Sequence, residues 1–131
     1  MKSEIFKNEY IEFWYEDEIL FSQFPEPIDL TYDNSRKIID FRNQISSNSK
    51  QYWCYDFRNV KSMDKKSRDY AEENGQNFLF ATGAIVKTSV QAFIVNFFIK
   101  LKNPKVPFKA FTSKDEAIAW LKELKKQNEH F

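Results

Sequence analysis

Residues 89–102 are predicted to form a helix that is apolar on two sides. At about 100° per residue, one broad face collects six apolar side chains, namely Val90, Phe93, Ile94, Phe97, Phe98 and Leu101. A narrower stripe on the opposite side consists of Ala92, Val95 and Ile99. Because the core of a monomer needs one apolar face, the stripe predicts a covering segment, a partner or a lipid. The apolar run is shorter than the roughly 20 residues that cross a bilayer, so we expect no membrane span.

The hydrophobic pattern also predicts five strands. Residues 10–15 and 19–24 form an N-terminal hairpin in this prediction, and the proline-rich segment that follows ends it. Residues 52–57 and 81–86 are nearly unbroken apolar runs, which is typical of strands covered on both faces. Residues 106–111 form a short strand whose proline favours an edge position.

Three further helices are predicted from capping signals. Thr31 is a suitable N-cap for a helix that ends at the serine- and asparagine-rich segment 46–49. Asp64 precedes a second helix, which ends near Gly75. Ser113-Lys114-Asp115-Glu116 is a capping box ahead of the final helix, which carries apolar side chains at helical spacing.

The predicted order is β-β-α-β-α-β-α-β-α. Strands that alternate with helices after the hairpin predict a mainly parallel central sheet with right-handed crossovers. We therefore expect an α/β fold with an N-terminal hairpin and four helices. With 131 residues, the chain is expected to form one domain over residues 1–131.

Composition narrows the function classes. Aromatic residues make up 18% of the chain, with 14 Phe, which predicts a dense core and argues against disorder. A net charge of +1 gives no field that would favour nucleic acid, so we expect no nucleic-acid partner. The charged N-terminal segment lacks the apolar stretch of a secretory signal, and the chain has one cysteine; both favour the cytoplasm.

Residues that usually carry catalysis are scarce. The two glycines, Gly75 and Gly83, are too few for a phosphate-binding or dinucleotide-binding loop, and Gly83 is expected to let a helix approach its strand. His130 is the only histidine and is the penultimate residue, so neither a metal site nor a nucleophile–histidine pair is expected. Cys54 is predicted to be a small core residue. We therefore expect no cofactor, no metal and no enzymatic activity.

Basic residues and hydroxyls gather around the start of the second predicted helix. Exposed N–H groups at a helix start favour anions, and neighbouring cations add to this preference. A phosphate, a lipid head group or an acidic loop of a partner are the ligands considered for such a site, and an ordinary solvated helix start is the alternative. The residues concerned are Arg58, Lys61, Ser62, Lys65, Lys66 and Ser67.

The element order and the segment after residue 56 resemble the STAS fold of anti-sigma-factor antagonists and sulfate-transporter tails. Those domains carry Asp-x-Ser-x-Val-x-x-x-Asp-Ser-Ser-Gly at the end of a central strand, and Asp56, Val60 and Asp64 match it. Residues 5–126 also resemble small bacterial proteins described as STAS-like or related to CRAL-TRIO lipid-transfer domains. The segments SRDYAEENG, VNFFIKLKNP and FTSKDEAIAWL carry this likeness.

The chain departs from the STAS pattern at the switch residue. In anti-sigma-factor antagonists the second Ser of the Asp-Ser-Ser-Gly run accepts the phosphate, and the corresponding position here is Lys66. Ser67 stands at the glycine position. The resemblance therefore implies the fold without the usual phosphorylation switch.

Two functions remain open from the sequence. The first is a non-enzymatic regulatory or interaction module of STAS-like type that binds a protein partner or forms a homodimer through residues 89–102, with Ala92, Val95 and Ile99 at the interface. The hairpin or residues 102–107 would cover the stripe if no partner does. The second is an apolar-ligand or lipid-binding module, although a chain this short is expected to leave little room for a cavity of a few hundred Å³.

Overall fold

The computed structural model describes residues 2–129, except for the side chains of Ile94, Phe97, Phe98 and Leu101. Strands and helices follow one another along this part of the chain in the order β1 Phe6–Lys7, β2 Glu12–Glu16, β3 Ile19–Gln23, β4 Ile28–Leu30, α1 Tyr32–Ile45, β5 Gln51–Asp56, β6 Val60–Met63, α2 Lys65–Asn74, β7 Leu79–Ile85, α3 Ser89–Lys102, β8 Phe108–Phe111 and α4 Lys114–Glu129.

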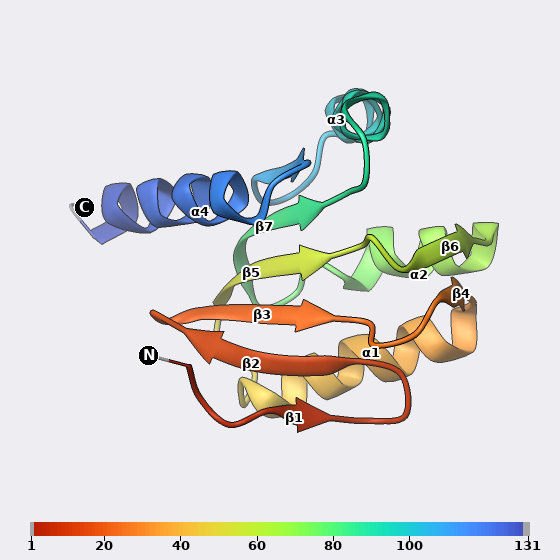
Figure 1. The fold of residues 1–131 in the computed structure, drawn as a ribbon, viewed down its shortest axis with the longest axis horizontal. Helices are drawn as coiled ribbons and strands as arrows, with labels where there is room; N and C mark the ends of the chain where they lie inside the picture. Colours follow the sequence, from red (N-terminus) through yellow and green to blue (C-terminus); the bar gives the residue numbers. More distant parts are fainter. Residues whose placement is uncertain (1, 130–131) are drawn as a thin grey trace.

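The main sheet has six strands in the order β1-β2-β3-β5-β7-β8 (Figure 1). β1, β2 and β3 pair antiparallel, and β3, β5, β7 and β8 are parallel to one another. β8 is an edge strand of this sheet, as the proline near its start predicted. The predicted α/β fold, with a mostly parallel sheet, an N-terminal hairpin and four helices, is confirmed.

Three short strands were not predicted. β1 pairs with β2, and β4 pairs with β6 in a separate two-stranded sheet. Val60 to Met63 form β6, although no element was predicted between the strand at residues 52–57 and the helix after Asp64. Strands this short have too few alternating positions to be recognised locally. In addition, β4 and β6 depend on each other although they are about thirty residues apart.

The β2–β3 hairpin turns without a glycine. Asp17 and Glu18 both have positive φ angles, 51° and 67°, and Glu16 pairs with Ile19 across the turn. Positive φ at both central residues is the geometry of a tight hairpin turn that matches the twist of the strands. Aspartate tolerates the left-handed region better than most residues, which permits this turn.

The two faces of the sheet are covered differently. α4 packs on one face, where Ala117 and Leu121 join a cluster with Trp14, Phe21 and Cys54. The Cβ position of Gly83 lies 3.4 Å from the Leu121 side chain, so this glycine faces the closely packed helix. α1 packs on the other face through residues such as Ile38, α2 contacts α1, and α3 lies beside β8 (Figure 1).

The described side chains that α2 and α3 pack on this side of the molecule are of modest size. Ser67 is the single buried residue of α2, all of whose residues are described. Ala92 and Val95 of α3 are half-buried against a small cluster of Ala84, Val86 and Ala110. Because no large side chain from α2 fills the space toward the sheet, a hollow remains on this face.

None of the helices between residues 2 and 129 combines the length and the apolar character that crossing a bilayer requires.

Candidate functional site

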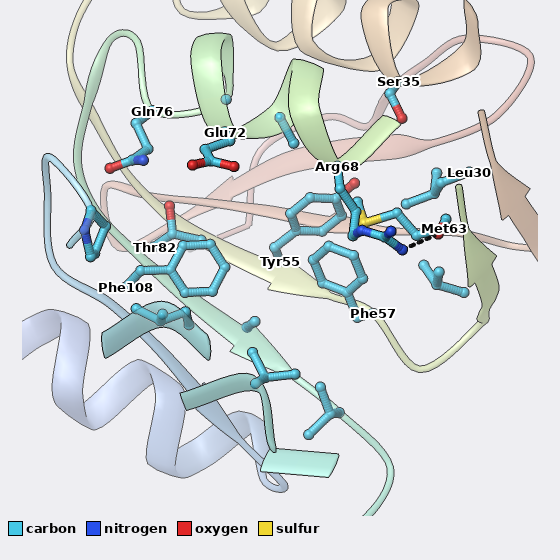
Figure 2. Close-up of a pocket in the computed structure, with 18 of the residues that line it drawn as sticks. Leu30, Ser35, Tyr55, Phe57, Met63, Arg68, Glu72, Gln76, Thr82 and Phe108 are labelled. Carbon is cyan, nitrogen blue, oxygen red and sulfur yellow. Dashed lines mark hydrogen bonds between the residues drawn. The ribbon is translucent and has the colours of Figure 1, made fainter. Parts of the chain in front are cut away.

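A cavity of about 1480 Å³ lies between the sheet, α2 and α3 (Figure 2). Side chains from β5, β7, α1, α2, α3, β6 and the segment before β8 line it, and exposed lysines at its border show that it is open to solvent. The expectation that a chain of this length leaves little room for a cavity of a few hundred Å³ is therefore wrong. The space comes from small residues on the surfaces that face each other.

The floor of the cavity is formed by neighbouring positions of the parallel strands. Trp53 pairs in register with Thr82, and Tyr55 pairs with Ala84, so these four side chains point to the same face. The rings of Trp53 and Tyr55 stack with centroids 4.1 Å apart, and Phe57 extends the row with a centroid 4.2 Å from Tyr55. The floor therefore consists of aromatic rings along β5 and of the small side chains of Thr82 and Ala84 along β7.

The Tyr55 side chain is almost completely buried, with 8% of its surface exposed. Burial raises the pKa of its phenol well above the ordinary value of 10.0, although the charge of Arg42 acts in the opposite direction. Tyr55 therefore remains neutral at physiological pH. The cavity floor carries no ionised side chain at this position.

The walls of the cavity combine small residues from the α2 region with β-branched residues from α3. Ala71 and Gly75 of the α2 region lie on one side, and Val95 and Ile99 of α3 lie on the other. At Ala71, a leucine or phenylalanine would project into the space that is now open. Glu72 and Gln76 border the cavity where α2 ends (Figure 2).

Polar contacts hold α3 and the following loop in place above the sheet. The Asn96 side chain accepts a hydrogen bond from the Ala110 backbone N–H at 2.7 Å and donates one to the Ala110 carbonyl at 3.1 Å. The Gln76 side-chain oxygen accepts from the backbone N–H of Val106 at 3.0 Å. Lys102 pairs with Glu72 at 3.7 Å. These contacts connect α3 to both β8 and α2.

The predicted stripe of α3 faces inward. Ala92 and Val95 pack toward Ala84, Val86 and Ala110, and Val95 and Ile99 line the cavity. By contrast, Val90 and Phe93 of the broad face are 68% and 72% exposed. The orientation is therefore the reverse of the one expected, in which the stripe was the surplus face. The other members of the broad face, Ile94, Phe97, Phe98 and Leu101, lie outside the described side chains.

The basic residues near the start of α2 are mostly engaged by carboxylates. Lys61 lies 3.7 Å from Asp29, whose other oxygen accepts a hydrogen bond from Ser62 at 2.7 Å. Lys65 pairs with Asp69 at 2.9 Å. Arg58, Lys61 and Ser62 line the border of the cavity, whereas Lys65, Lys66 and Ser67 do not. The structure thus brings together only half of the predicted anion site.

Ser67 is inaccessible, with 0% of its surface exposed, and its hydroxyl lies 2.5 Å from that of Ser35. The Asp64 carboxylate accepts a hydrogen bond from the Ser67 backbone N–H at 2.8 Å and so occupies the helix start. Its negative charge competes with any anion at this position. These contacts give Ser67 a structural role between α1 and α2.

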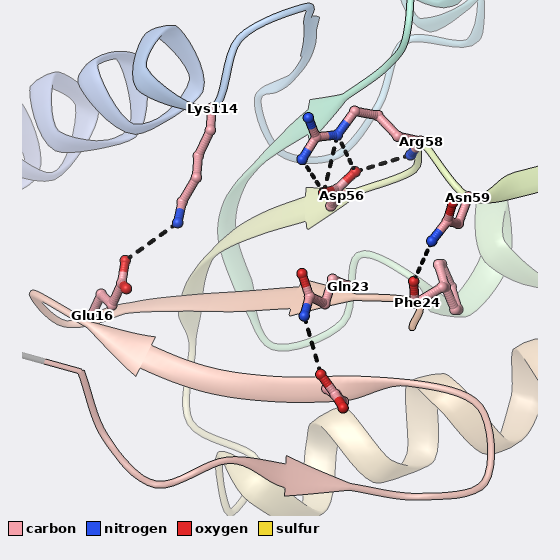
Figure 3. A network of polar contacts seen from close by, with 8 residues as sticks. Glu16, Gln23, Phe24, Asp56, Arg58, Asn59 and Lys114 are labelled. Atoms are coloured by element: carbon pink, nitrogen blue, oxygen red, sulfur yellow. Dashed lines mark hydrogen bonds and ion pairs between the residues drawn. The ribbon is translucent and has the colours of Figure 1, made fainter. Parts of the chain in front are cut away.

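Asp56, which matches the STAS pattern at the end of β5, forms an ion pair with Arg58. Arg58 donates to both oxygens of the Asp56 carboxylate, with Nη2 2.7 Å from Oδ2 (Figure 3). The hydrogen bonds and charge of Asp56 raise the pKa of the Arg58 guanidinium above its ordinary value. Beside them, the Asn59 side chain donates to the Phe24 carbonyl at 2.6 Å. A polar hollow of about 350 Å³ lies among these residues.

Sequence reasoning missed the cavity residues Trp53, Tyr55 and Thr82, because it treated their strands as ordinary core. The available signal was the alternation of β7, which puts the modest side chains of Thr82 and Ala84 on one face, together with the small residues Ala71 and Gly75 in the α2 region. Small residues on both of two facing elements indicate space that their side chains cannot fill.

Cys54 is buried, as predicted, with 1% of its surface exposed. Burial raises the pKa of its thiol from 9.0 to about 12. The thiolate that a nucleophile or metal ligand needs is therefore absent at neutral pH. Within residues 2–129, no three His, Cys, Asp or Glu residues come together as a metal site, and His130 lies outside the described residues.

The fold has a counterpart among solved structures. A crystal structure of an uncharacterized protein from the DUF3478 family, with a SpoIIAA-like fold, from Shewanella loihica PV-4 superposes with a TM-score of 0.62. The match covers 92% of this chain and 93% of the other, at 12% sequence identity. The STAS-like fold expected from the sequence is confirmed by this likeness, which at such identity concerns the fold alone.

At the level of sequence, no curated protein matches the chain. A family model described as "Domain of unknown function (DUF7793)" matches residues 13–125. Because this match spans most of the sequence, from the first core strand to the final helix, the chain belongs to the DUF7793 family.

Proposed function

We propose that this protein is a non-enzymatic binding module that holds a small amphiphilic molecule in the cavity between the sheet, α2 and α3. The observation that carries this proposal is the cavity itself, about 1480 Å³ with an aromatic floor. Ligand sites in proteins usually measure about 300–1,000 Å³ and are lined mainly by apolar and aromatic side chains with a few polar groups. The cavity therefore has room for a ligand with an acyl chain or a comparable apolar body.

The distribution of polar groups suggests how such a ligand would lie. Near the carboxyl ends of the strands, the Arg68 guanidinium donates one hydrogen bond to the Met63 carbonyl at 2.9 Å (Figure 2). A guanidinium has five N–H donors, so others remain for a ligand. Among residues 2–129, neither Arg68 nor Lys87 forms an ion pair, and both line the cavity. An anionic or strongly polar end of the ligand belongs at this border.

The apolar body of the ligand would then lie over Trp53, Tyr55, Ala84 and Ile99. Burying apolar surface contributes about 25 cal/mol per Å². A chain of moderate length would therefore gain several kcal/mol from this floor. The opposite border carries both signs of charge, Glu72 and Glu73 with Lys102 and Lys105, and gives no preference for an anion there.

Self-association through Ala92, Val95 and Ile99 receives less support. These side chains face the sheet and the cavity, so a partner could reach them only after α3 had moved away. The same inward orientation supports the ligand-binding alternative, because Val95 and Ile99 line the space that the ligand would occupy.

Native mass spectrometry of freshly purified protein tests the proposal. We expect a bound lipid-like molecule, or stoichiometric binding of a fluorescent fatty-acid analogue after delipidation. Binding near Trp53 should also change its fluorescence. A clean mass of the bare chain, together with no binding of the analogue, would contradict the proposal.

Two matched variants locate the binding site. Ala84→Leu fills the cavity from β7, since Ala84 is buried and lines it. Ala119→Leu makes the same change on the exposed surface of α4. We expect Ala84→Leu to abolish binding of the analogue while far-UV circular dichroism is unchanged. Equal binding by both variants would place the ligand elsewhere.

A further inference from the structure

Val90 and Phe93 form an exposed apolar patch on α3. They are 68% and 72% exposed, more than any other large apolar side chain described. Positions i and i+3 are neighbours on a helix surface, so the two side chains lie on the same side of α3. Single exposed apolar residues are ordinary, whereas a group on one helix face indicates a surface that contacts something.

The segment that contains α3 also has an unusual charge distribution. Residues 75–114 contain no Asp or Glu. Of the 20 Lys and Arg residues in the chain, six lie in this segment, so the other 14 share the rest of the sequence with all 19 acidic residues. The net charge of +1 is therefore the sum of a positively charged segment, residues 75–114, and a negatively charged rest of the chain. The six are Lys87, Lys100, Lys102, Lys105, Lys109 and Lys114.

Most of this positive charge is unpaired. Lys102 pairs with Glu72 and Lys114 with Glu16, each at 3.7 Å. The other four lysines of the segment are exposed and form no ion pair with the residues described between 2 and 129. Lys87 precedes α3, Lys100 lies in its last turn and Lys105 follows it. Lys109 lies in β8 in register with Gly83, on the face of the sheet that α4 covers. The exposed apolar patch is thus flanked by cations along the chain on both sides.

We propose that the outer face of α3 docks on an anionic lipid surface. In this arrangement Val90 and Phe93 enter the boundary between head groups and acyl chains, and Lys100 and Lys105 contact lipid phosphates. Helices with apolar residues on one face and lysines beside them bind in the plane of an anionic membrane in this way. The long apolar stems of lysine let its ammonium remain at the level of the head groups.

The residue types favour a lipid surface over a protein partner. Protein interfaces are enriched in Arg, Met, Tyr, Trp and Phe and depleted of Lys, and of the enriched types Phe is also common on helices that bind lipid surfaces. Residues 75–114 contain no Arg, Tyr or Trp, and all of their cations are lysines. Lysine close to an anionic leaflet contributes about 1 kcal/mol each. Charge complementarity and composition therefore both favour an anionic lipid surface.

The docked helix would lie between the lipid surface and the cavity. The inner side of α3 lines the cavity through Val95 and Ile99, while its outer side carries Val90 and Phe93. This inference goes beyond the proposed function and does not require it, because the outer face is available whether the cavity is filled or empty.

Co-sedimentation with vesicles tests the docking. We expect the protein to bind vesicles of equimolar phosphatidylcholine and phosphatidylglycerol, with weaker binding at high salt, and to bind phosphatidylcholine alone only weakly. Phe93→Ser should weaken binding about tenfold. Lys100→Gln combined with Lys105→Gln should weaken it about fivefold per lysine.

The controls make the same changes elsewhere. Phe80→Ser removes another partly exposed phenylalanine, and Lys66→Gln combined with Lys126→Gln removes two lysines outside the segment. Binding close to that of the natural sequence is expected for both controls. Loss of binding by these controls equal to that of the α3 variants would overturn the inference, and so would a failure of the natural sequence to bind.

Sedimentation equilibrium tests the remaining alternative, in which a second copy of the chain binds the exposed patch of α3. A dimer that Phe93→Ser converts to a monomer would show that a second copy of the chain covers this patch, which would also overturn the inference. Ala84→Leu separates the two proposals, because we expect it to retain vesicle binding while it loses the ligand. Vesicle binding by a protein that takes up no fatty-acid analogue would contradict the proposed function and leave the docking intact.

Discussion

The guanidinium of Arg42 lies over the ring of Trp53, with its Cζ atom 4.6 Å from the ring centroid. Arg42 is buried, with 1% of its surface exposed, and it donates to the carbonyls of Gly75 at 2.9 Å and Asn77 at 2.6 Å. No carboxylate among residues 2–129 pairs with it. One side chain of α1 therefore supports both the cavity floor and the segment that follows α2.

Replacing Arg42 should be strongly destabilising. Burial lowers the pKa of Arg42 from 12.5 to about 10, so the side chain is still charged at neutral pH. Arg42→Met keeps much of the volume but leaves two carbonyls without their donor, and we expect a loss of about 3 kcal/mol or more. Urea unfolding at neutral pH measures this loss.

Arg42→Lys is the matched control for charge. A lysine keeps the charge but lacks the planar fork that reaches two carbonyls at once. We expect it to recover less than half of the loss. Full recovery would show that charge over the Trp53 ring, and not the paired hydrogen bonds, stabilises this contact.

The Cys54 thiol gives the stability a defined pH dependence. In the unfolded chain it ionises near its ordinary pKa of 9.0, whereas in the folded protein it stays protonated up to about 12. Between these values the unfolded state binds fewer protons, so the free energy of unfolding falls as pH rises. Below pH 9 the thiol is protonated in both states and the effect is absent.

Comparing the natural sequence with Cys54→Ala isolates this contribution. We expect the free energy of unfolding of the natural sequence to fall more steeply between pH 9 and 10 than that of the variant. The tyrosines also begin to ionise in this range, but both proteins contain them, so their contribution cancels in the comparison. The variant starts lower because a buried side chain is shortened, but its slope should be smaller. Identical slopes would show that the thiol is already accessible to solvent in the folded protein.

Asn96 completes the hydrogen bonding of an edge strand. Its amide contacts both the N–H and the carbonyl of Ala110, a residue with 3% of its surface exposed. Asn96→Ala leaves both backbone groups unpaired, at a cost of about 1–3 kcal/mol for each. Hydrogen exchange should show loss of protection at the Ala110 amide. Asn96→Asp keeps the acceptor, so it should preserve that protection better than alanine does.

The helices whose starts carry capping residues were predictable from the sequence. Thr31 accepts a hydrogen bond from the Asn34 backbone N–H, and Ser113 accepts one from that of Glu116. Such signals act within one turn of the chain, so a local pattern contains them. The central strands were predictable for a similar reason, because their apolar runs are long enough to be recognised.

The orientation of α3 and the cavity could not be predicted in this way. A helix with two apolar faces gives no local sign of which one meets the sheet. Here the choice agrees with the Asn96 contact to Ala110, which depends on residues 14 apart in the sequence. Periodicity also identifies buried positions without measuring volume. Thr82 and Ala84 were therefore interpreted as ordinary core residues, although α2 and α3 leave a cavity above them.

The two glycines should respond differently to the same substitution. A methyl group at Gly75 would lie 2.5 Å from the Ala71 carbonyl oxygen, a backbone atom that can move only if the end of α2 moves. At Gly83 the nearest atoms belong to the Leu121 side chain, 3.4 Å away, which is an ordinary contact distance. Both glycines have negative φ angles, so contacts rather than backbone conformation decide the outcome.

Gly75→Ala is expected to destabilise the protein by about 1–3 kcal/mol. It should also weaken binding of the fatty-acid analogue, because the Gly75 carbonyl accepts from Arg42 and the residue lines the cavity. Gly83→Ala is expected to be neutral or to stabilise by about 0.4–1 kcal/mol, since it reduces the freedom of the unfolded chain. Urea unfolding of the two variants measures both effects. A destabilised Gly83→Ala would show that α4 cannot yield even a few tenths of an ångström at β7, and that this face of the sheet is the more rigidly packed one.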